Sequence, residues 1–415
     1  MKHIIILGGG QSAAYAAKVI REVDTKSQIT IISEEKNLPY ERPPLSKDFL
    51  LEKLNLKEIL FFSNEFYKEK NINIKTSEKI IKVNFENKTL ISSTNNNFTY
   101  DQLLIATGSS NRKLNIENLD QNIENEIIYL RDVEESKVIK DRMKSAEEIV
   151  IIGGGFIGLE IASSAAQLGK NVSVVEMGKQ LMGRAIPKEI ANIVQVIHEE
   201  NGNKFYLETH IKKITKNNNS FQILLNSNIS LSADLIIAGI GSLPNTSLFT
   251  NSPLEIDNGI ITDEFSQTSI PDVFAAGDVA NFFHPFYGMH MRLESFKHAQ
   301  NHGVNAAKNI LGIKTIYDNI PWMWSDQFNL NLQMTGICND YETFVQRGSN
   351  TDEGIIYFFL KNRMIRGACG LGVGGKIGRD IRLAGKLSEK RVKMTKGTLS
   401  NKNLKLNKLL SKSST

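Results

Sequence analysis

The sequence predicts an α/β protein with two domains built on parallel sheets, followed by a smaller α+β domain. Three observations predict this class. Residues 4–13 read as a short apolar strand, a glycine-rich turn and a helix of small residues. The same pattern recurs at residues 149–158, 145 residues further on. From Pro321 to about Cys369 the chain changes to short β segments separated by turn signals, and we expect this stretch to form the third domain.

The first pattern is typical of a dinucleotide-binding turn. The apolar run Ile4–Leu7 ends at Gly8, where a residue without Cβ permits the tight strand-to-helix turn. Gly10 allows a pyrophosphate to approach the backbone, and Ala13 lets the helix pack close to the strand. Glu34 follows after about 20 residues, where an acid accepts hydrogen bonds from ribose hydroxyls. The stretch therefore predicts one bound dinucleotide in a Rossmann-like domain.

The second pattern is a full G-x-G-x-x-G. It follows the apolar run Ile149–Ile152 and consists of Gly153, Gly155 and Gly158. Glu176 ends the next apolar strand, 21 residues after Gly155. Because two such motifs are far more specific than one, the repeat predicts two dinucleotides, one in each domain. The alternative is that the second glycine run is only a tight structural turn.

Two further strands bring polar groups to the carboxyl edge of the first sheet, where open α/β sheets bind ligands. The buried run 103–105 continues into Ala106-Thr107-Gly108. A second apolar strand, at residues 273–276, ends in Gly277-Asp278. The sequence therefore predicts a carboxylate at this edge.

Residues 38–47 form a proline-containing loop after Glu34. Pro43 and Pro44 predict an extended chain with no helix until Leu45, where a short helix starts. Lys47 at this helix start is unusual, because helix N-termini favour anions. A bound electron-rich group would explain it, and an exposed surface lysine is the alternative.

The motifs predict three domains. We expect a discontinuous first domain at residues 1–112 and 241–316, a second at 113–240, and an α+β domain with a basic tail at 317–415.

With 415 residues, 41% of them hydrophobic and 23% charged, the composition is globular. The first strand starts directly after Met1-Lys2-His3, and no apolar run reaches the about 18 residues of a membrane span. We expect a cytoplasmic protein without a signal peptide.

Basic charge gathers in the tail. Residues 376–415 carry twelve Lys and Arg residues and two acids, so the rest of this chain of net charge +5 carries −5. Three interpretations stay open: a solvated, partly disordered tail, a docking surface for an acidic partner, and nucleic-acid binding. The tail lacks the interleaved aromatic residues of a base-stacking surface, which disfavours the last.

These residues carry a family resemblance. The two fingerprints, residues 106–108 and Gly277-Asp278 resemble the glutathione-reductase-like flavoproteins with two dinucleotide-binding domains. Residues 38–47, 292–295 and 321–327 resemble more closely the NADH-dependent ferredoxin reductases that serve Rieske-type oxygenases and cytochromes P450. The resemblance implies that the first fingerprint holds FAD and the second NADH. It also implies a ferredoxin–NAD(+) reductase that passes electrons singly to a [2Fe–2S] ferredoxin, Rieske-type or four-cysteine.

The resemblance assigns cofactor-binding residues. Those expected to hold FAD are Gly8, Gly10, Ser12, Ala13, Glu34, Arg42, Lys47, Ile80, Ala106, Thr107, Gly108, Arg131, Gly277, Asp278, Phe296 and Trp324. Those expected to hold NADH are Gly153, Gly155, Ile157, Gly158, Glu160, Glu176 and Gly241. The Asp278 carboxylate is expected on the ribityl chain.

Two residues are expected at the reacting atoms. The resemblance implies that Lys47 lies near flavin N5 and that Glu160 pairs with Lys47 and meets the nicotinamide carboxamide. The alternative for Glu160 is an ordinary glutamate near a helix start that satisfies the helix dipole. Hydride transfer requires no nucleophile or general acid, and none is evident.

Glu176 indicates which nicotinamide cofactor binds. A carboxylate accepts a hydrogen bond from a ribose 2′-hydroxyl and repels a 2′-phosphate, so NADH is favoured over NADPH. Lys179 and Arg184 lie nearby in the sequence and weaken this prediction.

The two cysteines, Cys338 and Cys369, form no C-x-x-C and no disulfide framework. Residues 38–47 contain none, so a disulfide reductase is excluded, and there are too few ligands for an iron–sulfur cluster. Electrons must therefore leave directly from the flavin.

Three alternatives to a ferredoxin reductase remain: an NADH oxidase, a rubredoxin-type reductase and a binding flavoprotein similar to apoptosis-inducing factor.

Other candidates have less specific patterns. Trp322 and Trp324 alternate on a predicted strand and should face the same side, either by the flavin or in the core. His298 and His302 have metal-like spacing on a helix, but no third ligand is apparent, so we expect a place on the helix surface or beside the flavin and no metal. Tail cations including Arg379, Arg382, Lys386, Lys390 and Arg391 are candidates for steering an acidic ferredoxin. We expect a monomer or weak homodimer, with no nucleic-acid or membrane partner.

Overall fold

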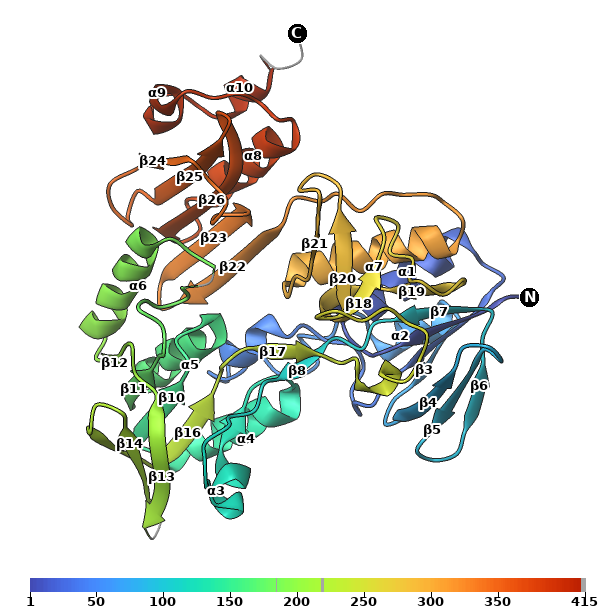
Figure 1. Cartoon of the computed structure of the whole chain (residues 1–415), viewed down its shortest axis with the longest axis horizontal. Helices are drawn as coiled ribbons and strands as arrows, with labels where there is room; N and C mark the ends of the chain where they lie inside the picture. Colours follow the sequence, from blue (N-terminus) through green and yellow to red (C-terminus); the bar gives the residue numbers. More distant parts are fainter. Residues whose placement is uncertain (184, 218–219, 412–415) are drawn as a thin grey trace. The chain divides into compact units, whose positions relative to one another are not determined.

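The computed structural model describes residues 1–183, 185–217 and 220–411, and the chain divides into two compact units (Figure 1). Unit 1 contains Met1–Arg42, Asn55–Ser110 and Ser242–Asn319. Unit 2 contains Pro43–Leu54, Asn111–Gly241 and Ile320–Thr415. Packing thus groups residues 43–54 and the predicted third domain with the second dinucleotide domain. The predicted three-domain division stays a prediction.

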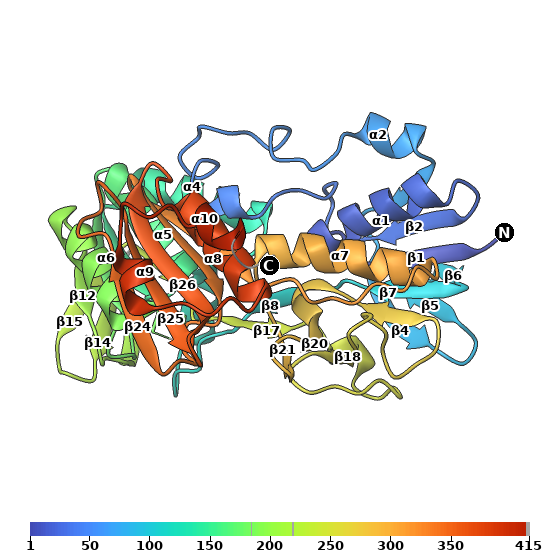
Figure 2. The ribbon, with the colours of Figure 1, turned by 90° about the horizontal axis from the view of Figure 1, so that it is seen from above.

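Unit 1 is built on a parallel sheet of five strands in the order β19-β7-β1-β2-β3. The strands are β1 His3–Leu7, β2 Gln28–Ile32, β3 Ile72–Lys75, β7 Gln102–Ile105 and β19 Val273–Ala275. The helices of this unit are α1 Gln11–Val23, α2 Asn64–Glu69 and α7 Phe296–Ile310. The helices α1 and α7 lie side by side along the sheet (Figure 2).

Both faces of this sheet are buried, which is why its strands read as continuous apolar runs. Because side chains alternate along a strand, Ile4 and Ile6 pack with the helical alanines of α1 and α7, such as Ala17 and Ala306. Ile5 and Leu7 pack on the opposite face against smaller β elements. The sheet is therefore a rigid support for the turn that follows β1.

The smaller elements of unit 1 are antiparallel or short. One sheet contains β4 Ile80–Asn84, β5 Thr89–Ser92 and β6 Asn97–Thr99, and another contains β18 Ile260–Thr262, β20 Ala280–His284 and β21 Met289–Met291. Short 3₁₀ turns occur at Ser247–Phe249 and Gly277–Val279. β8 Ser109–Asn111 pairs with β17 Ser242–Pro244.

Unit 2 repeats the parallel plan with the strand order β12-β11-β10-β16-β9. Its strands are β9 Ile128–Tyr129, β10 Glu148–Ile152, β11 Asn171–Val175, β12 Lys204–Tyr206 and β16 Leu235–Ala238. Its helices before residue 201 are α3 Gln121–Glu126, α4 Val133–Ser145, α5 Phe156–Gln167 and α6 Lys188–Glu200. An antiparallel sheet of β13 Ile211–Asn217, β14 Ser220–Leu225 and β15 Ser230–Ala233 covers one face.

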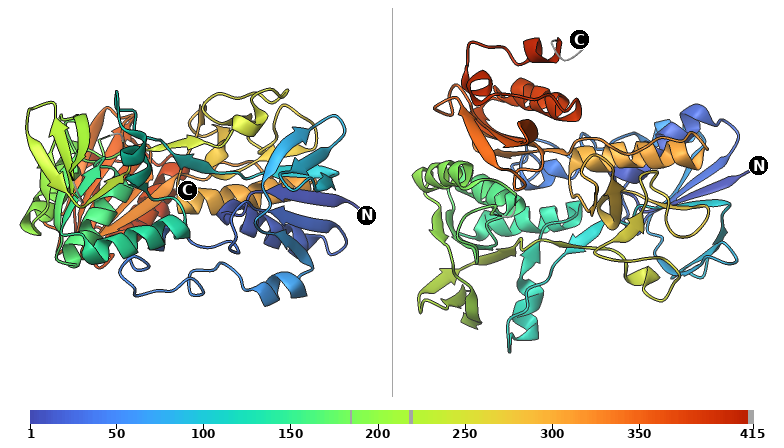
Figure 3. Two further views of the ribbon diagram at one scale, coloured as in Figure 1. Left: turned by 90° about the horizontal axis from the view of Figure 1, so that it is seen from below. Right: turned by 45° about the horizontal axis from the view of Figure 1, so that its top comes forward.

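The C-terminal part of unit 2 is an antiparallel sheet in the order β22-β23-β26-β25-β24. Its elements are β22 Trp322–Gln327, β23 Leu330–Gly336, β24 Thr343–Arg347, β25 Ile355–Lys361, β26 Met364–Val373 and the helices α8 Gly378–Glu389, α9 Lys396–Ser400 and α10 Asn407–Ser411. Leu332 and Phe359 pack against α6 residues such as Val194. Phe358 packs on the other face against α8, which lies along the sheet (Figure 3).

Two predictions about local structure are wrong. A 3₁₀ helix begins at Pro43, not after the prolines, because proline's fixed φ is tolerated in a first helical turn. The tail is folded over residues 376–411, so its interpretation as a partly disordered segment fails there. Ile381, Ala384 and Leu387 of α8 are fully buried and bind the tail to the C-terminal sheet.

A search of the described residues for a helix long and apolar enough to cross a bilayer found none.

Candidate functional site

The first glycine turn has the shape that a dinucleotide pyrophosphate requires. Gly8 has a φ of +124°, and a Cβ there would lie 2.1 Å from the Ala106 carbonyl oxygen. Gly10 caps the N-terminus of α1, and a Cβ on it would meet nothing within 4 Å. The turn is thus closed behind Gly8 and open above Gly10. Because the free N–H groups of a helix N-terminus favour phosphate, these residues fit the predicted FAD.

Ser12 supports this turn from behind. Its hydroxyl donates a hydrogen bond of 2.8 Å to the Ala299 carbonyl oxygen on α7. A Cβ on Gly303 of α7 would lie 2.4 Å from the Ser12 carbonyl oxygen, and one on Gly277 would lie 2.5 Å from its hydroxyl. Both glycines therefore allow close approach to α1. Sequence analysis missed Gly303, although an isolated glycine inside a helix often marks such packing.

The two predicted acids of unit 1, Glu34 and Asp278, follow their strands as the sequence predicts, and each has a different partner. Glu34 directly follows Ser33 and has a 66% exposed side chain that pairs with Lys79 at 2.7 Å. Asp278 stands at the carboxyl end of the β19 strand and accepts a hydrogen bond of 3.1 Å from Ser109. Arg42 pairs with Glu35, a neighbour of Glu34 that the sequence analysis did not consider.

The remaining predicted FAD residues divide between the units. Ala13, Ile80, residues 106–108 and Phe296 belong to unit 1. Lys47, Arg131 and Trp324 belong to unit 2. Arg131 directly precedes Asp132, the N-cap of α4. The FAD contacts of all these residues stay predictions.

His298 and His302 lie in an aromatic cluster of unit 1, not on the helix surface. His302 Nδ1 accepts a hydrogen bond from the Gly277 N–H at 3.3 Å, and His298 Nδ1 pairs with the Tyr317 hydroxyl at 2.8 Å. Burial lowers the pKa of His298 to about 4 and that of His302 well below its ordinary value. Both rings are therefore neutral at pH 7. Among the described residues no group of three His, Cys, Asp or Glu could hold a metal.

The second glycine turn repeats the shape of the first. Gly153 has a φ of +105°, and a Cβ there would lie 2.4 Å from the Gly239 carbonyl oxygen. A Cβ on Gly158 would lie 2.2 Å from the Gly153 carbonyl oxygen. The position at Gly155 stays open, with the nearest atom 3.9 Å away. These residues fit the pyrophosphate of the predicted NADH.

Glu176 is held against this turn. Its carboxylate accepts hydrogen bonds from the Gly154 N–H at 2.7 Å and the Gly178 N–H at 2.6 Å. A carboxylate has about four acceptor positions, so it can still accept from ribose hydroxyls. Lys179 is exposed, and Arg184 lies outside the described residues.

Two other residues predicted to contact NADH lie in unit 2. Ile157 is 43% exposed at the start of α5. Gly241 has a φ of +102°, and its carbonyl oxygen accepts a hydrogen bond from the Arg112 N–H. Their contacts with the cofactor stay predictions.

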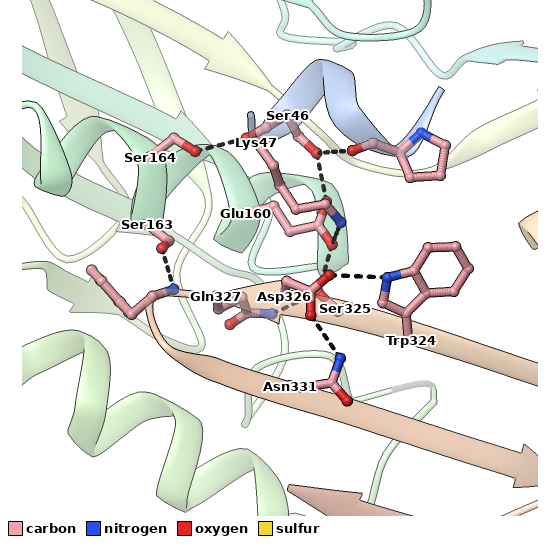
Figure 4. Close-up of polar contacts among 12 residues, drawn as sticks. Ser46, Lys47, Glu160, Ser163, Ser164, Trp324, Ser325, Asp326, Gln327 and Asn331 are labelled. Atoms are coloured by element: carbon pink, nitrogen blue, oxygen red, sulfur yellow. Dashed lines mark hydrogen bonds and ion pairs between the residues drawn. The ribbon is translucent and has the colours of Figure 1, made fainter. Parts of the chain in front are cut away.

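Lys47 and Glu160 form the predicted ion pair, which is thereby confirmed. The Lys47 ammonium donates to Glu160 Oε1 at 2.9 Å (Figure 4). The Glu160 side chain is only 4% exposed, and the first turn of α5 contains no acid. The alternative of a first-turn glutamate that satisfies the helix dipole is therefore wrong. Its carboxylate also accepts from the hydroxyls of Ser46 at 2.5 Å and Ser325 at 2.6 Å. Sequence analysis missed both serines, which lie far from Glu160 in the chain.

Trp322 and Trp324 face the same side of β22, as predicted. Their rings stack with centroids 5.3 Å apart and an interplanar angle of 24°. Trp322 packs against the hydrophobic cluster that includes α8. The Lys47 ammonium lies 5.9 Å from the centroid of the Trp324 ring, within the range of a cation–π contact.

Comparison with known proteins places this chain among flavoprotein reductases. Residues 2–303 match the family described as pyridine nucleotide-disulphide oxidoreductase, and residues 322–410 match a reductase C-terminal domain. The chain belongs to this family. The division of the matches at residues 303 and 322 agrees with the change of pattern near Pro321.

Individual members of the family are similar over almost the whole chain. The 3-phenylpropionate/cinnamic acid dioxygenase ferredoxin–NAD(+) reductase component of Photorhabdus laumondii is 33% identical, with 91% of this chain and 94% of that protein covered. A rubredoxin–NAD(+) reductase of Ectopseudomonas oleovorans is 34% identical, with coverages of 87% and 94%. The crystal structure of the ferredoxin reductase for the CYP199A2 system of Rhodopseudomonas palustris is 28% identical, with a TM-score of 0.92 and coverages of 98% and 99%.

Membership of the pyridine nucleotide-disulphide oxidoreductase family confirms the predicted fold class, the oxidoreductase activity and the cofactors FAD and NADH. The word disulphide in the family name does not describe the chemistry of this chain. Cys338 and Cys369 are both buried. Burial raises the pKa of Cys338 to about 12, so its thiol is inert at pH 7.

Proposed function

We propose that this reductase takes a hydride from NADH and passes single electrons to a [2Fe–2S] ferredoxin of an oxygenase or cytochrome P450 system. The observation that supports this most is the pair of glycine turns combined with the buried Lys47–Glu160 ion pair. The chain has no redox-active cysteine pair that could receive the electrons. Relatives that serve as ferredoxin–NAD(+) reductase components support a ferredoxin as the acceptor.

The residues of the chain bind and orient the cofactors. When bound, FAD accepts two electrons together and releases them one at a time. Gly8, Gly10 and the N-terminus of α1 would hold its pyrophosphate, and Asp278 its ribityl chain. Gly153, Gly155 and Glu176 would hold NADH. Lys47 and Glu160 would set the polar surroundings of the reacting rings, with Glu160 accepting a hydrogen bond from the carboxamide.

A rubredoxin-type reductase is the second candidate, because rubredoxin–NAD(+) reductases are as similar to this chain as ferredoxin reductases are. NADH oxidation should be measured with a [2Fe–2S] ferredoxin, with a rubredoxin and with oxygen alone. We expect rapid turnover with the ferredoxin. Faster turnover with rubredoxin favours the second candidate, and rapid turnover with oxygen alone favours an NADH oxidase. Slow turnover with a long-lived NADH complex favours a binding flavoprotein.

We further propose that the ferredoxin is acidic and docks on α8. Four cations, Arg379, Arg382, Lys386 and Lys390, are exposed and recur at helical spacing. They lie on the face away from the buried side of α8, because residues three and four apart share a helix face. The stretch contains two acids: Asp380, which pairs with Arg347 at 3.3 Å, and Glu389, which is exposed. Four exposed cations against one exposed acid leave this face of α8 with a net positive charge, which steers an acidic protein.

Charge reversal tests this docking surface. The double variant Arg382→Glu/Lys386→Glu should raise the KM for an acidic ferredoxin about tenfold or more, and the wild-type rate should fall with salt. Lys26→Glu, on an exposed cation of unit 1, is the matched control. NADH oxidation with ferricyanide should not change in either variant. A KM that the double variant leaves unchanged contradicts docking on α8. The oligomeric state and the cytoplasmic location stay predictions.

A further inference from the structure

The Glu160 carboxylate is held by two hydroxyls in addition to its ion pair (Figure 4). Oε1 accepts from the Lys47 ammonium at 2.9 Å and from the Ser325 hydroxyl at 2.6 Å. Oε2 accepts from the Ser46 hydroxyl at 2.5 Å. The same Ser46 hydroxyl is 3.4 Å from the Pro43 carbonyl oxygen, and its single proton serves the shorter contact. The donors come from two segments: residues 46–47, at the end of the 3₁₀ turn, and β22.

The direction of the Ser325 hydrogen bond is set by its own neighbours. Gln327 Nε2 donates to the Ser325 oxygen at 3.1 Å, which leaves the hydroxyl proton for Glu160. The other end of the Gln327 amide, Oε1, lies 2.9 Å from His198 Nε2. His198 Nδ1 lies 2.9 Å from the Asn203 amide nitrogen, which can only donate. Each group in this series therefore donates to the next: His198 to Gln327, Gln327 to Ser325, and Ser325 to Glu160.

This arrangement limits how the carboxylate can turn. A buried carboxylate with one partner can rotate about its terminal torsion, which is a soft angle. Hydroxyls on both oxygens restrict that rotation, and hydrogen bonds to a charged acceptor are the stronger kind. Since Lys47 is only 15% exposed and contacts Oε1, its position follows that of the carboxylate.

We propose that Ser325 and Ser46 are positioning residues for the reduction of the flavin by NADH. They orient the Glu160 carboxylate, and through it Lys47, so that neither has to rearrange when the nicotinamide binds. This inference rests on the proposed function, since it assigns the ion pair to the NADH reaction. A further consequence is that β22 has two roles, because Trp324 lies beside Lys47 while the next residue holds Glu160.

Single-hydroxyl variants test the positioning role. In Ser325→Ala and Ser46→Ala we expect kcat for NADH oxidation with ferricyanide to fall about tenfold, the factor that corresponds to one lost charge-assisted hydrogen bond. The KM for NADH should change less than threefold, and FAD content should be unchanged. Ser325→Thr keeps the hydroxyl and should restore at least half of the lost rate.

Ser163→Ala is the matched control. Ser163 is also buried on α5, and its hydroxyl accepts a hydrogen bond from the Phe328 N–H at 2.6 Å without touching Glu160. This variant should lower the melting temperature without lowering kcat. Equal effects of Ser163→Ala and Ser325→Ala on kcat would mean that the loss is one of general stability, and the proposal would be wrong. Should Ser325→Ala fail to fold, Ser46→Ala decides, because its hydroxyl lies on a separate segment.

A stability cycle tests the contact without turnover. The loss in melting temperature caused by Ser325→Ala should be at least halved in a Glu160→Gln background, because the hydrogen bond is then no longer to a charge. Equal losses in melting temperature in both backgrounds would overturn the proposal that Ser325 orients the Glu160 carboxylate. If the native protein does not oxidise NADH, the proposed function fails, while this cycle still decides whether Ser325 holds Glu160.

Discussion

The two glycine turns share a local sequence but differ in what surrounds them. At the third motif position, Ala13 is fully buried with its methyl group accommodated. At the equivalent Gly158, a methyl would lie 2.2 Å from the Gly153 carbonyl oxygen. The second helix start therefore lies closer to its strand turn than the first. The same motif is thus adapted to its site by one methyl group.

The acids after the two turns differ even more. Glu34 is mostly exposed and pairs with Lys79 on a neighbouring segment. Glu176 is half-buried, and backbone N–H groups of Gly154 and Gly178 hold its two oxygens. An exposed pair contributes little and shifts readily, whereas a carboxylate held by two amides is preorganised. Glu176 is therefore held as part of the second turn, whereas the exposed Glu34 side chain can change its conformation readily.

The largest expected effect comes from adding a methyl group at the first glycine of each turn. Gly8→Ala places Cβ 2.1 Å from a backbone oxygen at a φ of +124°, and Gly153→Ala places it at 2.4 Å with a φ of +105°. Each should cost more than about 4 kcal/mol, the range reserved for severe packing errors. Gly8→Ala should lose flavin absorbance, whereas Gly153→Ala should keep it and lose NADH binding.

Gly169→Ala is the control for these two variants. Gly169 also has a positive φ, of +76°, but a Cβ there meets nothing within 4 Å. It should cost only about 1 kcal/mol, the strain of the left-handed conformation. If Gly8→Ala retained full flavin content, the first turn would not be the FAD cradle and the contrast between the turns would disappear.

Acid should destabilise both units, and unit 1 more strongly. Burial lowers the pKa of His298 in unit 1 and of His198 in unit 2 to about 4 from 6.5. These rings are neutral in the fold, so their stabilising effect is complete above pH 6.5 and is lost as pH falls toward 4. Each contributes about 3 kcal/mol over that window. His302 and His284 of unit 1 shift in the same direction.

Calorimetry and flavin release between pH 7.5 and 4.5 test this difference. We expect flavin release to precede the unfolding of unit 2 as the pH falls. The exposed His210, replaced in His210→Gln, is the control and should leave the profile unchanged. A melting temperature that stays constant from pH 7 to pH 5 would contradict the buried, neutral state of these histidines.

The smallest expected effect comes from neutralising the two acids. Glu176→Gln keeps the size but loses the charge that repels a 2′-phosphate, and should reduce the ratio of kcat/KM for NADH over NADPH about tenfold. Glu34→Gln should leave this ratio unchanged and weaken flavin retention only a few-fold. A native ratio at or below one would remove the predicted preference for NADH.

Several predictions from the sequence depended on local physics, and these agree with the structure. The runs Ile4–Leu7 and Ile149–Ile152 are strands because apolar residues in short runs before glycine are buried on both faces of a parallel sheet. The alternation of Trp322 and Trp324 gave their common face. The start of the 3₁₀ helix at Pro43 was mispredicted, because proline both breaks helices and begins them.

The Lys47–Glu160 pair marks the limit of this kind of prediction. Its members are 113 residues apart, and only the family resemblance suggested their meeting. The serines that hold Glu160 were not predicted, since a serine has no spacing that reveals its distant partner. Gly303 differs, because a glycine inside a helix is a local signal of close packing. That signal does not identify the partner, which is the backbone of α1.

By itself the sequence determined the two glycine turns, the strands before them and the acids after them, because each depends on neighbours within a few residues. Only the tertiary structure decided which carboxylate is exposed, which is held by backbone amides and which is buried with a lysine and two serines. The physical reason is that burial of apolar surface brings distant chain segments together, and these segments form the environment of each charge. The residues next to a charge in the sequence do not reveal which distant segments will surround it.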